Sequence, residues 1–195
     1  MRKILLYLFV FPLQAFAQDS LLHNVFPVVE GKIAYTKVVQ VDSVKKDQLF
    51  LKIKDWASKT YVSQKATLDA EDKEGGLIVY KGYLPTKLIY HGGIANGKPY
   101  EVDIFHTIRF YIKDFKFKAV LTDLLSQSQD AASIYISNQT HQPIEKIPLE
   151  LWGNDVSKKR KEKAMDDAKA LNDQLLSFLE SIKKYVSSKN SEFNF

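Results

Sequence analysis

Apolar and polar side chains alternate over residues 100–113. A period of two sustained over this length predicts a long β-strand with one buried face and one partly exposed face. The side chains expected on the buried face are Tyr100, Val102, Ile104, His106, Ile108, Phe110 and Ile112. Asp114 is expected to begin a tight turn. A second alternating strand should then return antiparallel to the first, with these residues on its apolar side: Phe115, Phe117, Ala119 and Leu121.

Three shorter segments, residues 31–41, 66–70 and 77–83, also favour strands. In the first of them, four apolar side chains share one face: Ile33, Tyr35, Val39 and Val41. The other two flank residues 71–76, whose charges and paired glycines are typical of a hairpin turn. Residues 84–98 contain proline and glycine turn signals, and we expect them to leave the sheet as a hairpin excursion.

Two segments carry apolar residues at helical spacing. The first helix is expected to begin at Asp42 or Ser43, either of which can cap it, and to end near residue 62. Its apolar stripe is Leu49, Phe50, Ile53, Trp56, Ala57 and Tyr61. The second helix should begin at Asn154 or Asp155. Its stripe is Met165, Ala168, Leu171, Leu175, Phe178, Leu179, Ile182 and Val186. The lysines outside the first stripe are mostly expected on a solvated face: Lys45, Lys46, Lys52, Lys54 and Lys59.

The predicted order is one strand, a helix, four strands and a final helix. This order favours an α+β fold in which an antiparallel five-stranded sheet carries both helices on one face. We expect a single domain over residues 31–187, including the long C-terminal helix at 154–187. Each helix has one apolar stripe and each strand has one apolar face, so these surfaces can all be buried in one core. Residues 18–30 should form an extended lead-in, residues 126–153 are polar and loop-like, and residues 188–195 should form a flexible tail.

Residues 1–17 contain the three parts of a secretory signal peptide in order. Two basic residues precede an almost wholly apolar run at 4–16, and Ala15 and Ala17 are the small side chains that signal peptidase requires. The apolar run is shorter than the ~20 residues of a membrane-spanning helix. Cleavage is therefore expected between Ala17 and Gln18. It would leave an exported protein, periplasmic or secreted, with no transmembrane segment.

The chain contains no cysteine. This excludes a disulfide scaffold, a bacterial lipoprotein anchor, catalysis by thiolate and zinc sites made of cysteine. Hydrophobic residues make up 45% of the 195 residues, which favours a globular protein with an ordinary apolar core. The formal net charge of +5 falls to +3 if Arg2 and Lys3 leave with the signal peptide, so charge alone is a weak argument for an anionic partner.

Three motifs are specific enough to compare with known families. They are Asp47-Gln48-Leu49-Phe50 with Trp56, Glu71-Asp72-Lys73-Glu74-Gly75-Gly76-Leu77-Ile78, and the alternating pair of strands over residues 100–117. Together, over about residues 27–125, they resemble a domain-of-unknown-function family with a TATA-binding-protein-like (TBP-like) fold, found in exported proteins of Gram-negative gut and oral bacteria. The resemblance implies a TBP-like β-α-β(4)-α fold. It implies no activity, because the family has no assigned function and a fold does not fix a function.

The expected outer face of the sheet mixes aromatic and basic side chains. They are Phe105, Thr107, Arg109, Tyr111, Lys116 and Lys118. Such a surface can bind carbohydrate, an anionic polymer or a protein. The alternative is that a loop or the 126–150 segment simply covers this face. Our candidate binding residues are Phe105, Arg109, Tyr111, Lys116 and Lys118.

Neither a metal nor a cofactor is expected. The four histidines lack the spacing of metal ligands: His23, His91, His106 and His141. His106 lies on the apolar face of the longest strand, where we expect a hydrogen-bonded core histidine. Nucleic acid is not an expected partner either. TATA-binding proteins use two tandem copies of the fold and inserted side chains, whereas this chain has one copy and an export signal.

The sequence thus predicts an exported envelope protein, most simply a non-enzymatic module that binds an envelope protein or glycan through the outer face of its sheet. The alternative is a hydrolase or carbohydrate-active enzyme that uses acidic residues near 69–74, because paired carboxylates can carry out hydrolysis or bind calcium. These residues are Asp69, Glu71, Asp72 and Glu74. The two hypotheses differ in whether these carboxylates converge in a cleft or splay from a turn.

Overall fold

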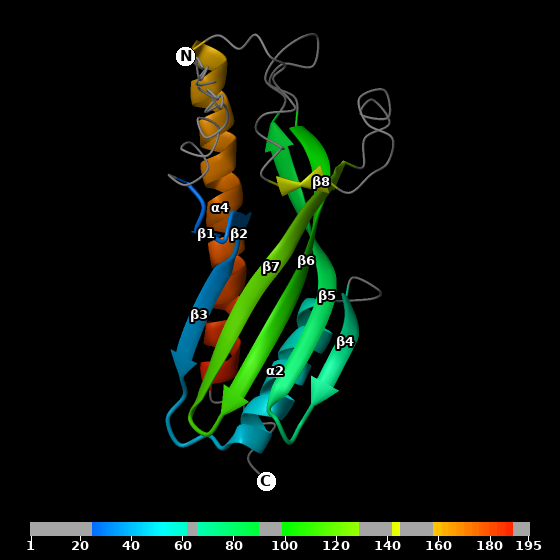
Figure 1. Cartoon of the computed structure of the whole chain (residues 1–195), viewed down its shortest axis with the longest axis vertical. Coiled ribbons are helices and arrows are strands. Elements are labelled where there is room, and N and C mark those ends of the chain that lie inside the picture. The colour runs from blue at the N-terminus through cyan, green and yellow to red at the C-terminus, as the bar shows by residue number, and fades with distance from the viewer. Residues whose placement is uncertain (1–24, 62–65, 90–98, 129–141, 145–157, 189–195) are drawn as a thin grey trace, which may run out of the picture.

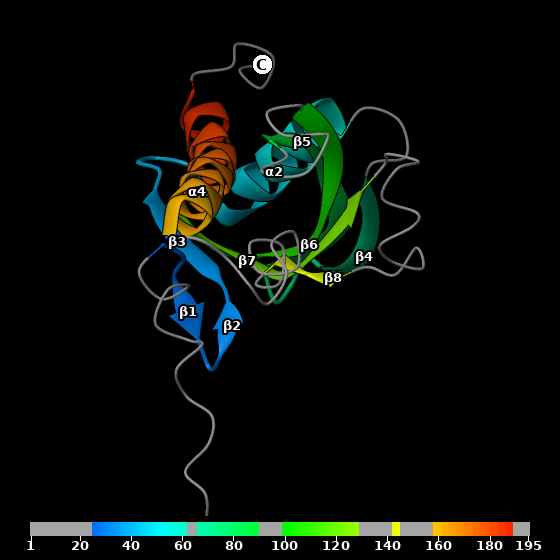
Figure 2. The same ribbon diagram turned by 90° about the horizontal axis from the view of Figure 1, so that it is seen from above.

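The described part of the chain contains a curved antiparallel sheet with two helices on one face (Figure 1, Figure 2). The computed structural model describes residues 25–61, 66–89, 99–128, 142–144 and 158–188. The long strands are β3 (Tyr35–Gln40), β4 (Ala66–Asp72), β5 (Leu77–Ile89), β6 (Pro99–Lys113) and β7 (Lys116–Ser128). They lie in the order β3-β7-β6-β5-β4, and every neighbouring pair is antiparallel. The helices are α2 (Lys46–Thr60) and α4 (Lys158–Ser187). The predicted α+β class and five-stranded sheet are confirmed.

Three short strands complete the described part of the chain. β1 (Val28–Val29) and β2 (Lys32–Ile33) form a small hairpin, which Gly31 helps to close with a φ of 75°. β8 (Gln142–Pro143) pairs with β7. The single strand predicted over residues 31–41 is therefore divided, and the predicted lead-in contains β1. The division is at Ala34, whose N–H donates to the carbonyl of Pro27 at 3.0 Å instead of to a sheet neighbour.

β5 is longer than the sequence predicted. Its register with β6 continues from Leu77↔Tyr111 to Ile89↔Pro99, so residues 84–89 belong to the sheet and only residues 90–98 of the expected excursion lie outside the described residues. Pro85 has no N–H to offer a neighbouring strand. It is tolerated because the pairing with β4 ends at Gly82, which leaves β5 as an edge strand at this point.

Helix α2 is capped from a distant part of the chain. The predicted caps at Asp42 and Ser43 are wrong: the helix begins at Lys46, its N-cap residue makes no side-chain hydrogen bond, and Ser43 has a φ of 63°. The N–H of Lys46 instead donates to Oδ1 of Asp114, in the β6–β7 turn, at 2.8 Å. A carboxylate at a helix N-terminus satisfies a free N–H and complements the helix dipole. The first turn of α2 is therefore fixed by tertiary structure.

The core lies between the helices and the sheet and is centred on Trp56. This side chain is 2% exposed and packs edge-on against Tyr61 and Phe110, with ring centroids 5.7 and 5.8 Å away. From α4, the ring of Phe178 approaches to 5.5 Å. All six residues of the first predicted stripe are buried, and so are those of the second stripe except Met165, which is partly exposed. Both helices thus use the faces that their periodicity predicted.

His106 is a core residue, as the sequence predicted. Its Nδ1 lies 3.3 Å from the carbonyl oxygen of Ile104, and its Nε2 lies 2.6 Å from the hydroxyl of Tyr61. A proton on Nδ1 can donate to the Ile104 carbonyl, which leaves Nε2 to accept the hydrogen bond of Tyr61. Burial lowers the pKa of His106 to about 4. The imidazole is therefore neutral at physiological pH and serves as a hydrogen-bonded part of the core.

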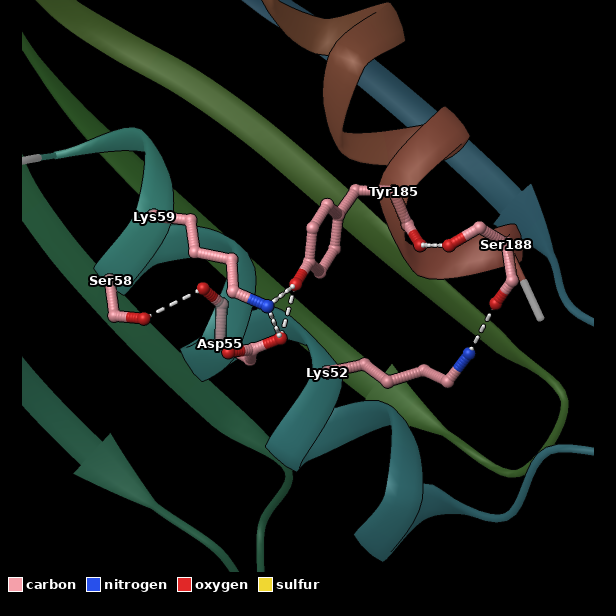
Figure 3. A network of polar contacts seen from close by, with 6 residues as sticks. All are labelled: Lys52, Asp55, Ser58, Lys59, Tyr185 and Ser188. Atoms are coloured by element: carbon pink, nitrogen blue, oxygen red, sulfur yellow. Dashed lines mark hydrogen bonds and ion pairs between the residues drawn. The ribbon is translucent and has the colours of Figure 1, made fainter. Parts of the chain in front are cut away.

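A buried lysine joins the two helices (Figure 3). We expected Lys52 on a solvated face, but this side chain is only 9% exposed. Its ammonium donates to the carbonyl oxygens of Val186 at 3.1 Å and Ser188 at 2.7 Å, at the C-terminal end of α4. The last carbonyls of a helix lack intrahelical donors and carry partial negative charge. Lys52 thus caps α4 from α2.

A second polar contact between the helices lies one turn further along α2 (Figure 3). The hydroxyl of Tyr185 donates to the carboxylate of Asp55, and Lys59 Nζ lies 3.0 Å from Asp55 Oδ2 and 2.6 Å from the Tyr185 hydroxyl. The hydrogen bond from Tyr185 and the charge of Lys59 lower the pKa of Asp55. Burial and Asp55 raise the pKa of Tyr185, so this phenol stays protonated and acts as a donor.

The pKa of His106 predicts a pH-dependent stability. Between about pH 4 and 6.5 the unfolded chain binds a proton at this residue while the folded chain does not, so stability falls as the pH is lowered through this range. The slope from one such group is at most roughly 1.4 kcal/mol per pH unit. Urea unfolding at several pH values should show a shallower decline for His106→Gln than for the wild type. Parallel curves for the two proteins would contradict the assignment.

The cap on α4 predicts a difference between two lysines of the same helix. Lys52→Met leaves two carbonyl oxygens without their donor and should lower the free energy of unfolding by about 1–3 kcal/mol. Lys54 pairs with Glu71 at 2.8 Å in a partly exposed position, so Lys54→Met should cost less than about 1 kcal/mol. Urea denaturation measures both values, and equal losses would show that Lys52 is not a special link between the helices.

Candidate functional site

All five candidate binding residues lie on the outer face, which we define as the face of the sheet opposite to the helices. On β6, Phe110 and Ile112 are buried against the helices, so the alternating residues point the other way. The register pairs Tyr111 with Lys118 and Arg109 with Val120. Lys116 has the same parity as Lys118 on β7. The five residues on this face are Phe105, Arg109, Tyr111, Lys116 and Lys118.

The lower part of the outer face carries a basic–aromatic patch, which consists of Val38, Leu77, Tyr111, Lys116 and Lys118. The register places Val38 beside Lys118, Lys118 beside Tyr111, and Tyr111 beside Leu77, so four strands contribute. Val38 is 59% exposed and Tyr111 is 43% exposed. Exposed apolar groups gathered on one face are typical of interaction surfaces.

The positive charge of this patch is not neutralised by its described neighbours. Lys118 Nζ lies 4.6 Å from the centroid of the Tyr111 ring, a cation–π contact that holds the ammonium over the aromatic face. Within the described ranges, no carboxylate oxygen lies within ion-pair distance of Lys116 or Lys118. An anionic group that approaches this face would therefore find two ammonium groups and a half-exposed phenol.

The guanidinium group of Arg109 is less available to a binding partner than the sequence suggested. Its guanidinium donates to Oγ1 of Thr122 at 2.7 Å and lies 3.6 Å from Oδ2 of Asp123. Asp123 has a φ of 55° at an irregularity in the pairing of β6 with β7, which turns its carboxylate toward the arginine. Arg109 is thus tied to β7, and its charge is balanced locally.

Phe105 belongs to a separate cluster higher on the sheet. Its ring lies 5.4 Å from that of Tyr83 on β5, and the register places it opposite Leu125 on β7. Six residues of strand, or about 20 Å, separate it from Tyr111. The structure therefore brings Tyr111, Lys116 and Lys118 together, but it does not bring Phe105 into the same patch.

Two members of the patch were missed by the sequence analysis, namely Val38 and Leu77. A signal for Val38 was present, because it alternates with the buried Val39 and must face outward. Its proximity to Tyr111 was not predictable, because it depends on β3 pairing with β7 rather than with its neighbour in sequence.

The acidic residues near 69–74 splay from their turn. Asp69 pairs with Lys81 at 3.0 Å, and Glu71 pairs with Lys54 of α2 at 2.8 Å. Oδ1 of Asp72 accepts the N–H of Gly75 at 2.8 Å, so this carboxylate closes the turn. Three of the four carboxylates thus have separate partners, and Glu74 is bonded through its backbone carbonyl, which accepts from Lys46 Nζ at 2.9 Å. The described residues contain no group of three or more His, Cys, Asp or Glu side chains that could hold a metal ion.

The backbone conformation and close packing at the end of this turn explain why Gly76 is a glycine. Gly76 has a φ of 72°, and a Cβ at this position would lie 2.2 Å from the carbonyl oxygen of Ile112. The carbonyl of Gly76 accepts the N–H of Ile112 at 2.7 Å, which fixes the turn against β6. The glycine-rich motif therefore positions the hairpin and does not form a ligand cradle. Neither described helix is long and apolar enough to cross a membrane.

Comparison with solved structures identifies the same fold in two bacterial proteins. A TBP-like protein from Parabacteroides distasonis superimposes with a TM-score of 0.53 and 16% sequence identity, over 81% of this chain and 96% of that one. A DUF4468 family protein from Bacteroides ovatus superimposes with a TM-score of 0.57 and 13% identity, over 86% of this chain and 93% of that one. At these identities the likeness shows the fold alone.

Comparison with curated proteins found no match. In the comparison with family models, residues 35–127 match the domain of unknown function DUF4468 with TBP-like fold. This range begins at β3 and ends within β7, so it contains α2, the β4–β5 turn, β6 and most of β7, which carry the three sequence motifs. Residues 35–127 therefore carry a DUF4468 domain with a TBP-like fold, which confirms the resemblance that the sequence indicated.

Proposed function

We propose that this protein is an exported, non-enzymatic binding module of the bacterial envelope, and that its partner docks on the basic–aromatic patch. The observation that carries the proposal is the combination on one face of half-exposed Tyr111, strongly exposed Val38 and the ammonium groups of Lys116 and Lys118, which have no carboxylate within ion-pair distance among the described residues. Folding gains nothing from leaving apolar groups exposed, whereas a partner would bury them.

The chemistry of the patch selects a partner that carries negative charge. Carboxylates or phosphates can pair with Lys116 and Lys118, and a flat apolar group or sugar ring can pack on Tyr111 and Val38. An acidic envelope protein and an anionic glycan both meet these requirements. Arg109, which is held by Thr122 and Asp123, would support the surface from one side.

The export proposal rests on the pattern of residues 1–17. The basic start, the apolar run and the alanines at 15 and 17 match the requirements of the secretion machinery and of signal peptidase. The mature protein would begin at Gln18 and remain periplasmic or be secreted.

The docking proposal predicts position-specific crosslinking in the native envelope. A photoreactive amino acid at Tyr111 should form a discrete adduct, and Lys118→Glu should remove it, because the charge that attracts the partner is reversed. The control is the same amino acid at Leu176 on α4, which is 44% exposed against 43% for Tyr111. Protease digestion of the adduct distinguishes a protein from a glycan. Adducts of equal yield at both positions would contradict the proposal.

The export proposal predicts a defined N-terminus. Mass spectrometry of the protein from the envelope fraction should find a chain that begins at residue 18. Ala17→Leu should leave an uncleaved precursor, because the signal peptidase site admits only small side chains at this position. Phe16→Leu, at the neighbouring tolerant position, should be processed normally. An unprocessed wild-type chain that retains Met1 would refute the cleavage site.

A further inference from the structure

The turn between β6 and β7 contains an aromatic residue in a backbone conformation that favours glycine. Lys113 pairs with Lys116, so Asp114 and Phe115 form a two-residue hairpin turn. Phe115 has a φ of 65°. Turns with a positive φ at their second central residue usually have Gly or Asn there, because the Cβ of other residues is crowded. The sequence analysis placed Phe115 on the buried side of the second strand; the structure shows instead that it is a turn residue.

The backbone of Phe115, but not its ring, holds the fold together. Its N–H donates to the carbonyl of Val44 at 3.0 Å, and its carbonyl oxygen accepts the N–H of Val41 at 2.8 Å. These bonds attach the turn to the loop before α2 and impose the positive φ. A glycine could make both bonds without strain. The ring is 44% exposed, so burial does not explain why a large aromatic side chain occupies the position.

One ammonium group lies over this ring, and two more lysines lie next to the turn. Lys45 Nζ lies 5.5 Å from the centroid of the ring, and the exposed side chains of Lys113 and Lys116 flank the turn on the two strands. Asp114 lies among them, but its carboxylate accepts the N–H of Lys46 and lies 3.8 Å from Lys45. Among the described residues, no carboxylate is within ion-pair distance of Lys113 or Lys116.

The turn is at one extreme of the molecule. In Figure 1 the β6–β7 turn lies at the lower end of the sheet, at the same end as the loop between β3 and α2 and the β4–β5 turn. An exposed aromatic ring at this end of the sheet, with basic side chains on the same turn and on the neighbouring loop, matches the chemistry of a membrane surface. There the ring can enter the interfacial region while the ammonium groups contact lipid phosphates.

We propose that the β6–β7 turn is a membrane-surface contact that inserts Phe115 between the headgroups of anionic phospholipids. A protein partner would need a pocket shaped for the exposed ring, whereas an anionic lipid surface can accept the ring and the neighbouring ammonium groups without a preformed site. One ring and three lysines are too few for stable anchoring, so the contact is weak and reversible. This site shares Lys116 with the basic–aromatic patch, but Phe115, Lys45 and Lys113 lie outside the patch, so each proposal can be tested without the other.

Co-sedimentation with vesicles tests the proposal. The chain that begins at Gln18 is used throughout, because the apolar segment before it would itself bind lipid. The wild type should sediment with vesicles of phosphatidylglycerol and phosphatidylcholine, and much less with phosphatidylcholine alone. Phe115→Gly should weaken binding at least about tenfold through the lost apolar contact, while its melting temperature stays the same or rises because the positive φ is relieved.

Charge variants distinguish an effect of the β6–β7 turn from an effect of the protein's net charge. Lys113→Glu should weaken binding by more than roughly fivefold, since each basic residue near an anionic surface contributes about this factor. Lys169→Glu makes the same charge change on an exposed part of α4 about 27 Å of helix from its C-terminal end, and it should change binding less than twofold. Phe115→Asn, which also tolerates a positive φ, repeats the test of the ring.

The outcomes are distinct. Wild-type protein that ignores anionic vesicles would overturn the proposal, and so would a folded Phe115→Gly variant that binds as well as the wild type. Equal losses for Lys113→Glu and Lys169→Glu would show that only net charge matters and would also overturn it. Tyr111→Ser should leave vesicle binding unchanged, so failure of this proposal and failure of the docking patch are told apart.

Discussion

Two helices bury one face of the sheet around Trp56, and the positions of the remaining surfaces follow from this packing. The ring contacts Tyr61, which directly follows its own helix, Phe110 on β6 and Phe178 on α4, so three elements meet at one side chain. Because side chains alternate along a strand, covering one face leaves the other to the solvent or to a partner. Phe110 and Ile112 are buried in the core, so Tyr111 between them points outward and becomes part of the basic–aromatic patch.

Polar contacts fix the helices at particular points on that core. Asp114 caps the first turn of α2, and Lys52 of α2 caps the last turn of α4, so the N-terminus of α2 and the C-terminus of α4 are each satisfied by a group from another element. The same turn that supplies Asp114 presents Phe115 to the solvent. The backbone of this turn and the carboxylate of Asp114 thus have a structural role, whereas the exposed ring of Phe115 has the proposed functional role.

Periodicity in the sequence predicted the parts of the fold that depend on local pattern. The alternation over residues 100–113 and the two helical stripes predicted which side chains would be buried, including His106. Contacts between distant segments could not be predicted in this way. The cap on α2 joins residues 68 positions apart, and the contact of Lys52 with Ser188 joins residues 136 positions apart. The position of Val38 in the patch was also not predictable from local pattern, because strand order is a property of the whole sheet.

The central claim is that the outer face is covered by a partner in the envelope while the helical face is free. The chain has no cysteine, so single cysteines can report on each face by their rate of reaction with a maleimide. In the purified protein, Val38→Cys and Leu176→Cys should both react readily, because both positions are exposed. In intact envelopes, the account predicts a several-fold slower reaction at position 38 and an unchanged rate at position 176. Unchanged rates at both positions would contradict it.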